Sequence, residues 1–171
     1  MQWAFHDPRP DEMDRVSYGE NSLTLAASGD SPANSSPLTC IAMDQAYQVE
    51  MNFEIEGDAE GAFLLYYNPK ALVGIGFTGE KAKTYQYATT EEWASVPLEG
   101  KKVRGRITND RNVITYHYSV DGGQTWRLHP TRMEVSGLNH NVFGGFLSLK
   151  VGICSLGEGS VTLSDFTYQA L

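Results

Sequence analysis

The chain has 171 residues, 41% of them hydrophobic, which fits one well-packed domain spanning residues 1–171. Its formal net charge of -8 argues against nucleic acid or an anionic membrane surface as a partner, because both recruit basic proteins. No apolar run is long enough to span a bilayer, which excludes a membrane protein with spanning helices.

The start of the chain lacks the basic and apolar stretches of a signal peptide. We therefore expect a bacterial cytoplasmic protein, unless a secretion signal lies upstream of this sequence. Cys40 and Cys154 each lie within an apolar strand, so we interpret them as small buried hydrophobic residues and not as a disulfide framework.

Short β-strands separated by turn signals fill the first half of the chain. In chain order, the predicted strands are Gln2–His6, Ser22–Ala27, Leu38–Met43, Tyr47–Glu56, Ala62–Tyr67, Ala71–Phe77 and Lys81–Tyr87. Tyr47–Glu56 alternates apolar and polar residues over its whole length, whereas Ala62–Tyr67 and Ala71–Phe77 are almost entirely apolar. A strand of the second kind is typically central and covered on both faces. Gly74 and Gly76 share one face, which marks a place where another group approaches the sheet.

Turn and helix signals separate these strands. Asp7–Asp14 is acidic and rich in proline, so it predicts a turn or a single helical turn. Ser28–Pro37 is a loop by composition, and Gly57–Gly61 is a predicted turn. Thr89–Trp93 resembles a helix start, with a threonine cap and an acidic first turn.

A hairpin over Val103–Trp126 organises the second half. Arg104 and Arg106 alternate with apolar residues in its first strand, and His117 takes the polar face of its second strand. Paired across a turn at Asn109–Asn112, the two strands carry all three side chains on one polar face above an aromatic core, over which Trp126 opens the next strand. The remaining predictions are strands at Arg127–Val135, Phe146–Ser155 and Val161–Gln169, with a loop at Ser136–Gly145.

Many short strands with turn signals, and no long helix, predict an all-β fold. The roughly dozen strands exceed a small immunoglobulin-type domain and favour a two-sheet antiparallel jelly-roll sandwich of the lectin-like type.

The residues predict no catalytic or metal site. Glycoside hydrolysis needs two carboxylates flanking one bond. The nearest candidates are Glu54, Glu56, Asp58 and Glu60. They occupy every second position and run into glycines, so an acidic edge that keeps the sheet in water is the favoured interpretation. There is no Gly-x-Ser-x-Gly motif, and the four histidines show no ligand spacing.

Ser119–Trp126 matches the Asp-box pattern Ser-x-Asp-x-Gly-x-Thr-Trp, which sialidase-type propellers repeat. One copy in a chain without repeats indicates a structural turn, in which Asp121 caps the turn and Trp126 packs beneath it.

Aromatic side chains beside polar groups are the clearest binding signal. Flat rings stack on the C–H faces of sugars while polar neighbours bond the hydroxyls. We predict Tyr85, Tyr87 and Trp93 as sugar-stacking residues; the alternative is that these rings belong to the core.

The order and spacing of several short motifs resemble the C-terminal β-sandwich module of family 43 glycoside hydrolases, the β-xylosidase and arabinofuranosidase group, also classed as carbohydrate-binding module family 91. The motifs are Ser31–Leu38, Gly61–Tyr67, Val73–Phe77, Ile107–Arg111, Tyr118–Gly122, Arg132–Gly137, His140–Phe146 and Asp165–Tyr168.

This resemblance implies a concanavalin-like jelly roll without catalytic residues of its own, because the propeller that carries catalysis in those enzymes is missing from this sequence. It implies xylan or xylo-oligosaccharide and the catalytic domain of a parent enzyme as partners. Two functions remain open: a sugar-binding module, or an accessory domain that buttresses and completes the parent's active site. A free-standing hydrolase or lyase is a weaker third. No cofactor is expected, and a structural calcium ion is left open.

The loop after residue 136 is the second candidate site, through His140, Asn141 and Phe143. Val142 and Phe143 could fold back as a plug over the open end of the sandwich. By resemblance, a loop of this module lies beside the catalytic pocket of the parent enzyme, where an aromatic residue closes a sugar subsite. Phe143 and Phe146 are both candidates for that aromatic residue, and His140 and Asn141 would supply hydrogen bonds.

Overall fold

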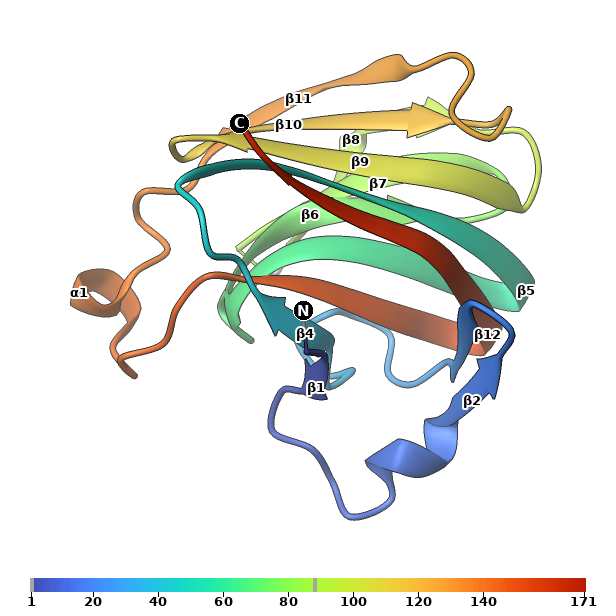
Figure 1. The fold of residues 1–171 in the computed structure, drawn as a ribbon, viewed down its shortest axis with the longest axis horizontal. Helices are drawn as coiled ribbons and strands as arrows, with labels where there is room; N and C mark the ends of the chain where they lie inside the picture. The colour runs from blue at the N-terminus through green and yellow to red at the C-terminus, as the bar shows by residue number, and fades with distance from the viewer. Residues whose placement is uncertain (1, 88) are drawn as a thin grey trace.

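A computed structural model describes residues 2–87 and 89–171, without the side chains of residues 89–93. The strands fold into two facing layers, with both chain ends on the outside and one short helix at one end of the molecule (Figure 1). Across the described residues, no helix is long and apolar enough to cross a membrane.

Twelve strands make up almost all of the regular structure. They are β1 (Ala4–Phe5), β2 (Val16–Gly19), β3 (Ser22–Ala26), β4 (Leu38–Ile41), β5 (Ala46–Asn68), β6 (Ala71–Phe77), β7 (Lys81–Gln86), β8 (Thr89–Pro97), β9 (Lys102–Asp110), β10 (Val113–Ser119), β11 (Arg127–Glu134) and β12 (Lys150–Ala170). A 3₁₀ turn η1 (Glu12–Arg15) precedes β2, and a helix α1 (His140–Phe143) lies between β11 and β12. All strand pairs are antiparallel, so the predicted all-β jelly-roll sandwich is confirmed.

Each layer contains half of β5 and half of β12. The first layer has the order β2-β3-β12-β5-β9-β10-β11, and the second has the order β1-β4-β12-β5-β6-β7-β8. The two long strands are shared because they pair with each other along nearly their whole length and pass from one layer to the other.

The predicted turn at Gly57–Gly61 is therefore wrong. The chain bends at Gly57 (φ 69°), but the strand continues, and the facing strand bends at Gly157 and Gly159 (φ 81° and 120°). A Cβ atom on Gly159 would lie 2.2 Å from the Glu56 carbonyl oxygen, so the corner requires glycine there. Glycine usually marks the end of a strand. Here the glycines let two paired strands bend together and form a corner of the sheet.

The alternation predicted for β5 persists through this corner. Its odd-numbered residues face the space between the layers from Tyr47 to Tyr67. Phe53 packs against Phe63 and Phe77 of the opposite layer, with ring centroids 5.6 and 5.3 Å away. Gly105 also faces this space, and a Cβ there would meet the Phe77 ring at 2.8 Å. The close approach of the two layers thus depends on a small residue in β9.

The chain before β4 covers the outer face of the second layer. Beneath it lies a second apolar cluster formed by Ala62, Leu64, Tyr66, Leu72, Tyr85, Cys154 and Leu156. The His6 ring packs edge-on against the Tyr66 ring at 4.9 Å. Covering on both faces explains why residues Ala62–Tyr67 of β5 are all apolar or aromatic. Both cysteines are buried, as predicted.

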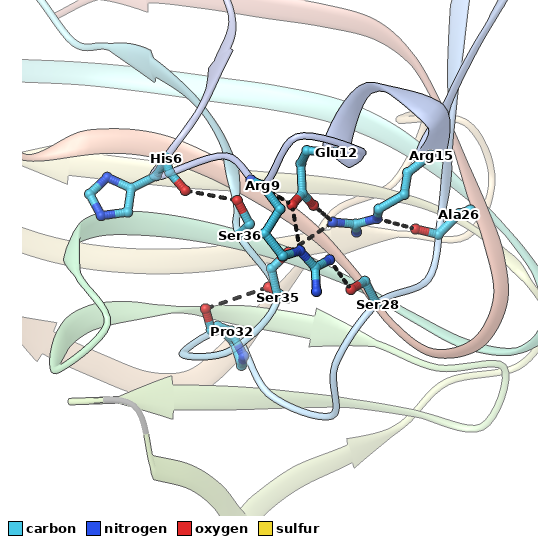
Figure 2. A network of polar contacts seen from close by, with 9 residues as sticks. All are labelled: His6, Arg9, Glu12, Arg15, Ala26, Ser28, Pro32, Ser35 and Ser36. Carbon is cyan, nitrogen blue, oxygen red and sulfur yellow. Dashed lines mark hydrogen bonds and ion pairs between the residues drawn. The ribbon is translucent and has the colours of Figure 1, made fainter.

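A buried ion network holds this covering segment (Figure 2). Glu12 is only 1% exposed and accepts hydrogen bonds from Arg15 and from Arg9, whose Nε lies 3.0 Å from Oε2. Arg15 also donates to the carbonyl oxygens of Ala26 (3.1 Å) and Ser35 (3.0 Å). One arginine therefore ties η1 to both ends of the loop between β3 and β4.

Two local predictions fail for identifiable reasons. Thr89–Trp93 is the start of strand β8 and not a helix, because its backbone pairs with β7. Tertiary pairing overrides local propensity there. Phe146 does not open a strand, since β12 begins at Lys150 and residue 146 has a φ of 51°. Strand β2, which the sequence analysis does not predict, pairs with β3 at the sheet edge.

Replacing Glu12 with glutamine (Glu12→Gln) is expected to lower the free energy of unfolding by about 3 kcal/mol, because Arg15 loses the charge that compensates its burial. Burial raises the pKa of Glu12, but the hydrogen bonds from Arg15 and Arg9 outweigh it and hold that pKa below its ordinary value of 4.5. The contribution is thus full above pH 4.5 and is lost as the pH falls through the folded-state pKa.

Urea unfolding from pH 7 to pH 3 measures this effect, and the wild type and variant should converge at the acid end. Glu54→Gln is the control, because Glu54 forms an exposed ion pair with Lys102 and should change stability by less than about 1 kcal/mol. Equal losses in both variants would contradict the assignment of the network as a stabilising device.

Candidate functional site

The hairpin of β9 and β10 carries Arg104, Arg106 and His117 on one face, as predicted, and its turn is shorter than predicted because Asn109 and Asp110 are paired strand residues. His117 lies opposite Arg106, and both point away from the core, with Tyr116 and Tyr118 buried beneath. Arg104 and Arg106 both pair with Glu50 of β5, at 3.0 and 2.7 Å. Burial and the nearby guanidinium of Arg106 lower the pKa of His117. This face is a closed network of charges and not an open acid–base pair.

Trp126 lies just before β11 and packs on the polar face of the hairpin, whereas the sequence analysis placed it at the start of a strand over the core. Its ring lies under the guanidinium of Arg106, with 3.7 Å between the Arg106 Cζ and the ring centroid. The turn before it is structural, as predicted: Asp121 accepts from the Thr125 amide at 2.9 Å and from the Thr125 hydroxyl at 2.6 Å. These bonds hold the pKa of Asp121 well below its usual range.

The carboxylates in the acidic stretch of β5 differ in their exposure. Glu54, Glu56 and Asp58 are exposed, whereas Glu60 is 8% exposed. The Glu60 carboxylate accepts from the Tyr85 hydroxyl and pairs with Lys83 at 2.8 Å. Among the residues that the structure describes, no group of three or more His, Cys, Asp or Glu side chains could hold a metal ion.

Tyr85 is not available for stacking on a sugar, which corrects the sequence prediction. The residue is 1% exposed and lies in the cluster beneath the N-terminal segment. Gly76 does make room for a close approach, but the approaching groups belong to the protein: a Cβ there would meet the Glu60 Oε1 atom at 2.1 Å and the Tyr85 ring at 2.9 Å. Gly74 similarly accommodates the backbone of Phe63.

Tyr87 behaves differently although it lies two residues further along. It follows the end of β7 with a φ of 49°, which breaks the alternation, and it is 43% exposed. Its ring stacks on that of Phe143, with centroids 6.2 Å apart and an interplanar angle of 28°. The structure thus joins two predicted site residues from distant parts of the chain.

These residues belong to the α1 segment, which we define as residues 137–147, and to its surroundings. Asn139 caps α1, because its side-chain oxygen accepts from the Asn141 amide at 2.9 Å. Tyr67 supports the segment from the core: its hydroxyl donates to the Gly144 carbonyl oxygen and accepts from the Leu147 amide at 3.3 Å. A buried tyrosine of β5 therefore fixes the position of an exposed loop.

The two phenylalanines of this segment have opposite environments. Phe143 is partly buried against the core and faces Tyr67 at 6.4 Å as well as Tyr87, as the plug interpretation expects. Val142 does not share in the plug, because it is 63% exposed. Phe146 is 87% exposed in a left-handed backbone conformation (φ 51°).

Contacts with His140 hold Phe146 in this exposed position. The two rings stack with centroids 3.6 Å apart and an interplanar angle of 20°, and the His140 Nδ1 accepts from the Phe146 amide at 3.2 Å. With Nδ1 acting as an acceptor, the neutral ring carries its proton on Nε2, where it can donate to a ligand. A half-exposed imidazole beside an exposed ring is suited to a sugar, which offers both hydroxyls and apolar C–H faces.

The structure thus gathers Tyr87, His140 and Phe143 at one end of the sandwich, together with Phe146, the other aromatic candidate of this loop. Asn141 lies on the same helix and is exposed. Trp93 is on β8, and its side chain lies outside the described residues. The Gly-Gly pair before Phe146 is a signal in the sequence that favours a loop position over a strand for this residue. In the structure both glycines have a positive φ (68° and 85°), which interrupts a strand.

The fold is a lectin-like β-sandwich. An aromatic loop, the α1 segment, lies at the end of the sandwich where the ends of β5 and β12 meet. A profile of the family described as the Beta xylosidase C-terminal Concanavalin A-like domain matches residues 1–169. The chain belongs to this family, which confirms the resemblance found in the sequence.

Solved structures agree on the fold. A mutant of the GH43 protein BlXynB from Bacillus licheniformis is 15% identical with a TM-score of 0.84, over 99% of this chain and 37% of that one. A xylan beta-1,4-xylosidase from Bacillus halodurans is 14% identical with a TM-score of 0.79, over 98% and 36%. This chain therefore spans little more than a third of those proteins.

The fold also makes up nearly all of another solved chain. A functionally unknown protein from Saccharomyces cerevisiae is 12% identical with a TM-score of 0.62, over 99% of this chain and 96% of that one. No curated protein matches this chain.

The two phenylalanines should differ in their effect on stability. Phe143→Ala is expected to lower the free energy of unfolding of the isolated domain by about 2 kcal/mol, since a partly buried ring leaves a smaller cavity than a fully buried one. Phe146→Ala should change it by less than about 0.5 kcal/mol, because the ring is exposed. Chemical denaturation of both variants measures this; similar losses would show that Phe146 also plugs the sandwich.

Proposed function

We propose that this chain is a non-catalytic accessory domain of a family 43 glycoside hydrolase, and that its α1 segment completes a sugar subsite of the parent enzyme. The observation that carries the proposal is Phe146. A large apolar ring that is 87% exposed, on a backbone at φ 51°, is unfavourable unless a partner covers it. The chain belongs to a family of β-xylosidase C-terminal domains, so the catalytic domain of the parent enzyme is the partner that we propose covers this ring.

The arrangement around Phe146 supports a role in positioning. Tyr67 and His140 hold the segment through hydrogen bonds to its backbone, so the ring meets a partner without further ordering. In the proposed complex, Phe146 closes the apolar side of the subsite while the His140 Nε2 donates to a sugar hydroxyl. Asn141 supplies a further hydrogen bond from the exposed face of α1.

In the full-length parent enzyme, Phe146→Ala is expected to lower kcat/KM for an aryl xyloside at least about tenfold, the effect of losing some 1.4 kcal/mol of transition-state binding. The matched control is Tyr18→Ala, which removes another well-exposed ring (74%, on β2). The isolated chain should show no turnover.

Unchanged kinetics in Phe146→Ala would contradict the proposed subsite. Turnover by the isolated chain that a point substitution in it abolishes would contradict the non-catalytic assignment.

A second candidate function is independent binding of xylan or xylo-oligosaccharide. It is favoured by Tyr87, whose ring is 43% exposed and braced by Phe143, an arrangement that suits stacking on a pyranose. Trp93 remains a proposed stacking residue from the sequence. Binding of this kind should be weak, because few rings meet the sugar and ordering costs offset their contribution.

Native gel electrophoresis of the isolated domain in soluble xylan tests this second function. The domain should be retarded, and Tyr87→Ala should reduce the binding free energy by at least about 1 kcal/mol. Trp93→Ala in the same gels tests the other ring, and Tyr18→Ala should leave retardation unchanged. A domain that migrates alike with and without xylan has no independent affinity for it.

A further inference from the structure

The exposed Phe146 lies in a tight turn over residues 144–147 that two side chains hold in place. Gly145 and Phe146, at the centre of the turn, both have a positive φ (85° and 51°), as in type I′ turns, where glycine and asparagine are preferred. The Tyr67 hydroxyl bonds to the backbone groups at the two ends of the turn. The His140 Nδ1 accepts from the Phe146 amide inside it. The strained position of Phe146 therefore depends on one tyrosine and one histidine.

The contact with His140 is the one that depends on pH. Histidine is the side chain that ordinarily changes its charge between about pH 5 and 8. A neutral imidazole accepts at Nδ1 while its proton is on Nε2, whereas an imidazolium donates from both nitrogens and accepts at neither. The hydrogen bond from the Phe146 amide to the His140 Nδ1, at 3.2 Å, therefore exists only while His140 is neutral.

Protonation of His140 changes the geometry as well as the charge. An Nδ1–H group and the Phe146 amide cannot point at each other across 3.2 Å, because their hydrogen atoms would clash. Either the imidazole or the peptide must rotate, and rotation of either disturbs the two rings, which are stacked at 3.6 Å. An attraction between the cation and the aromatic face, about 0.5–1 kcal/mol at an exposed site, does not restore the present position of the amide.

The elements next to the α1 segment present titratable groups of other kinds. Tyr67 of β5 bonds the turn, and Tyr87 after β7 stacks on Phe143. Glu134, at the end of β11, accepts from the amide two residues further on at 2.8 Å. Lys150 opens β12. Tyrosine, glutamate and lysine ordinarily titrate outside the range of histidine, so a change in the turn between about pH 5 and 8 is assigned to His140.

We propose that His140 is a pH-sensitive switch for the α1 segment: neutral His140 holds Phe146 in its exposed position, and protonation of His140 releases it. The consequence for catalysis rests on the proposed function, in which Phe146 closes a sugar subsite of the parent enzyme. In that complex the domain completes the subsite near neutral pH and loses this contribution as the pH falls. The release itself is a property of this chain alone.

Nuclear magnetic resonance on the 171-residue chain tests the release. From about pH 8 to pH 5, the chemical shift of the Phe146 amide and those of the His140 ring nitrogens should follow one transition. Across that transition, the protection of the Phe146 amide against hydrogen exchange, corrected for the intrinsic rate at each pH, should fall about fivefold. A fall of this size corresponds to the loss of one hydrogen bond.

Three variants make the assignment specific. His140→Asn offers an amide oxygen in place of Nδ1 and does not titrate, so the Phe146 amide should keep its protection down to about pH 5. His140→Phe keeps a ring for the stack but has no acceptor, so it should show the low protection of the acid state at every pH. His117→Asn is the matched control, since His117 lies on the first layer in β10 and its loss should leave the transition intact.

Three outcomes would overturn the proposal: a Phe146 amide that does not follow the His140 titration, the wild-type transition persisting in His140→Asn, or wild-type protection in His140→Phe near neutral pH. Each leaves the accessory function standing, because the kinetics of Phe146→Ala in the parent enzyme test that function at a single pH. Conversely, unchanged kinetics in Phe146→Ala would remove the consequence for catalysis, whereas the transition in the isolated chain would persist.

Discussion

The pairing of β5 with β12 is the constraint on which the rest of this structure depends. The two strands run side by side from Tyr47–Ala170 to Tyr66–Lys150 and bend together at their glycines, so one strand pair forms the middle of both layers. Because both strands fold back at the corner, their four ends meet at the opposite end of the sandwich (Figure 1).

That geometry explains why the candidate sites gather in one place. The connection into β5, the exit from β5 at Tyr67 and the entry into β12 all lie at the end away from the corner, and the β9–β10 turn is brought there by its pairing with β5. Sandwich loops carry function because the scaffold positions them without using them for packing. Here the scaffold also contributes a side chain: Tyr67, near the end of β5, bonds the backbone of the α1 segment.

Periodicity predicted this fold because burial in a sandwich repeats every two residues. It predicted the inward face of β5 and the shared polar face of Arg106 and His117 correctly, since both depend on alternation alone. It failed where one backbone torsion changes the face. Tyr85 and Tyr87 are two residues apart, yet the positive φ of Tyr87 sends one ring outward and leaves the other beneath the N-terminal segment. No composition rule distinguishes a glycine that ends a strand from one that bends it, which is why the corner at Gly57 was predicted as a turn.

Backbone strain gives independent support for placing function at this end. Non-glycine residues at positive φ are uncommon and cost roughly 1–3 kcal/mol each when the side chain is not suited to that region. Four of them lie here: Tyr87, Arg111, Asn112 and Phe146. Asparagine tolerates the conformation in a tight turn, so Asn112 needs no other explanation. A glycine would relieve the strain at both aromatic residues. Each instead presents a ring to solvent, one braced by Phe143 and the other by His140. Exposed rings on a strained backbone support the proposal that a partner contacts this surface.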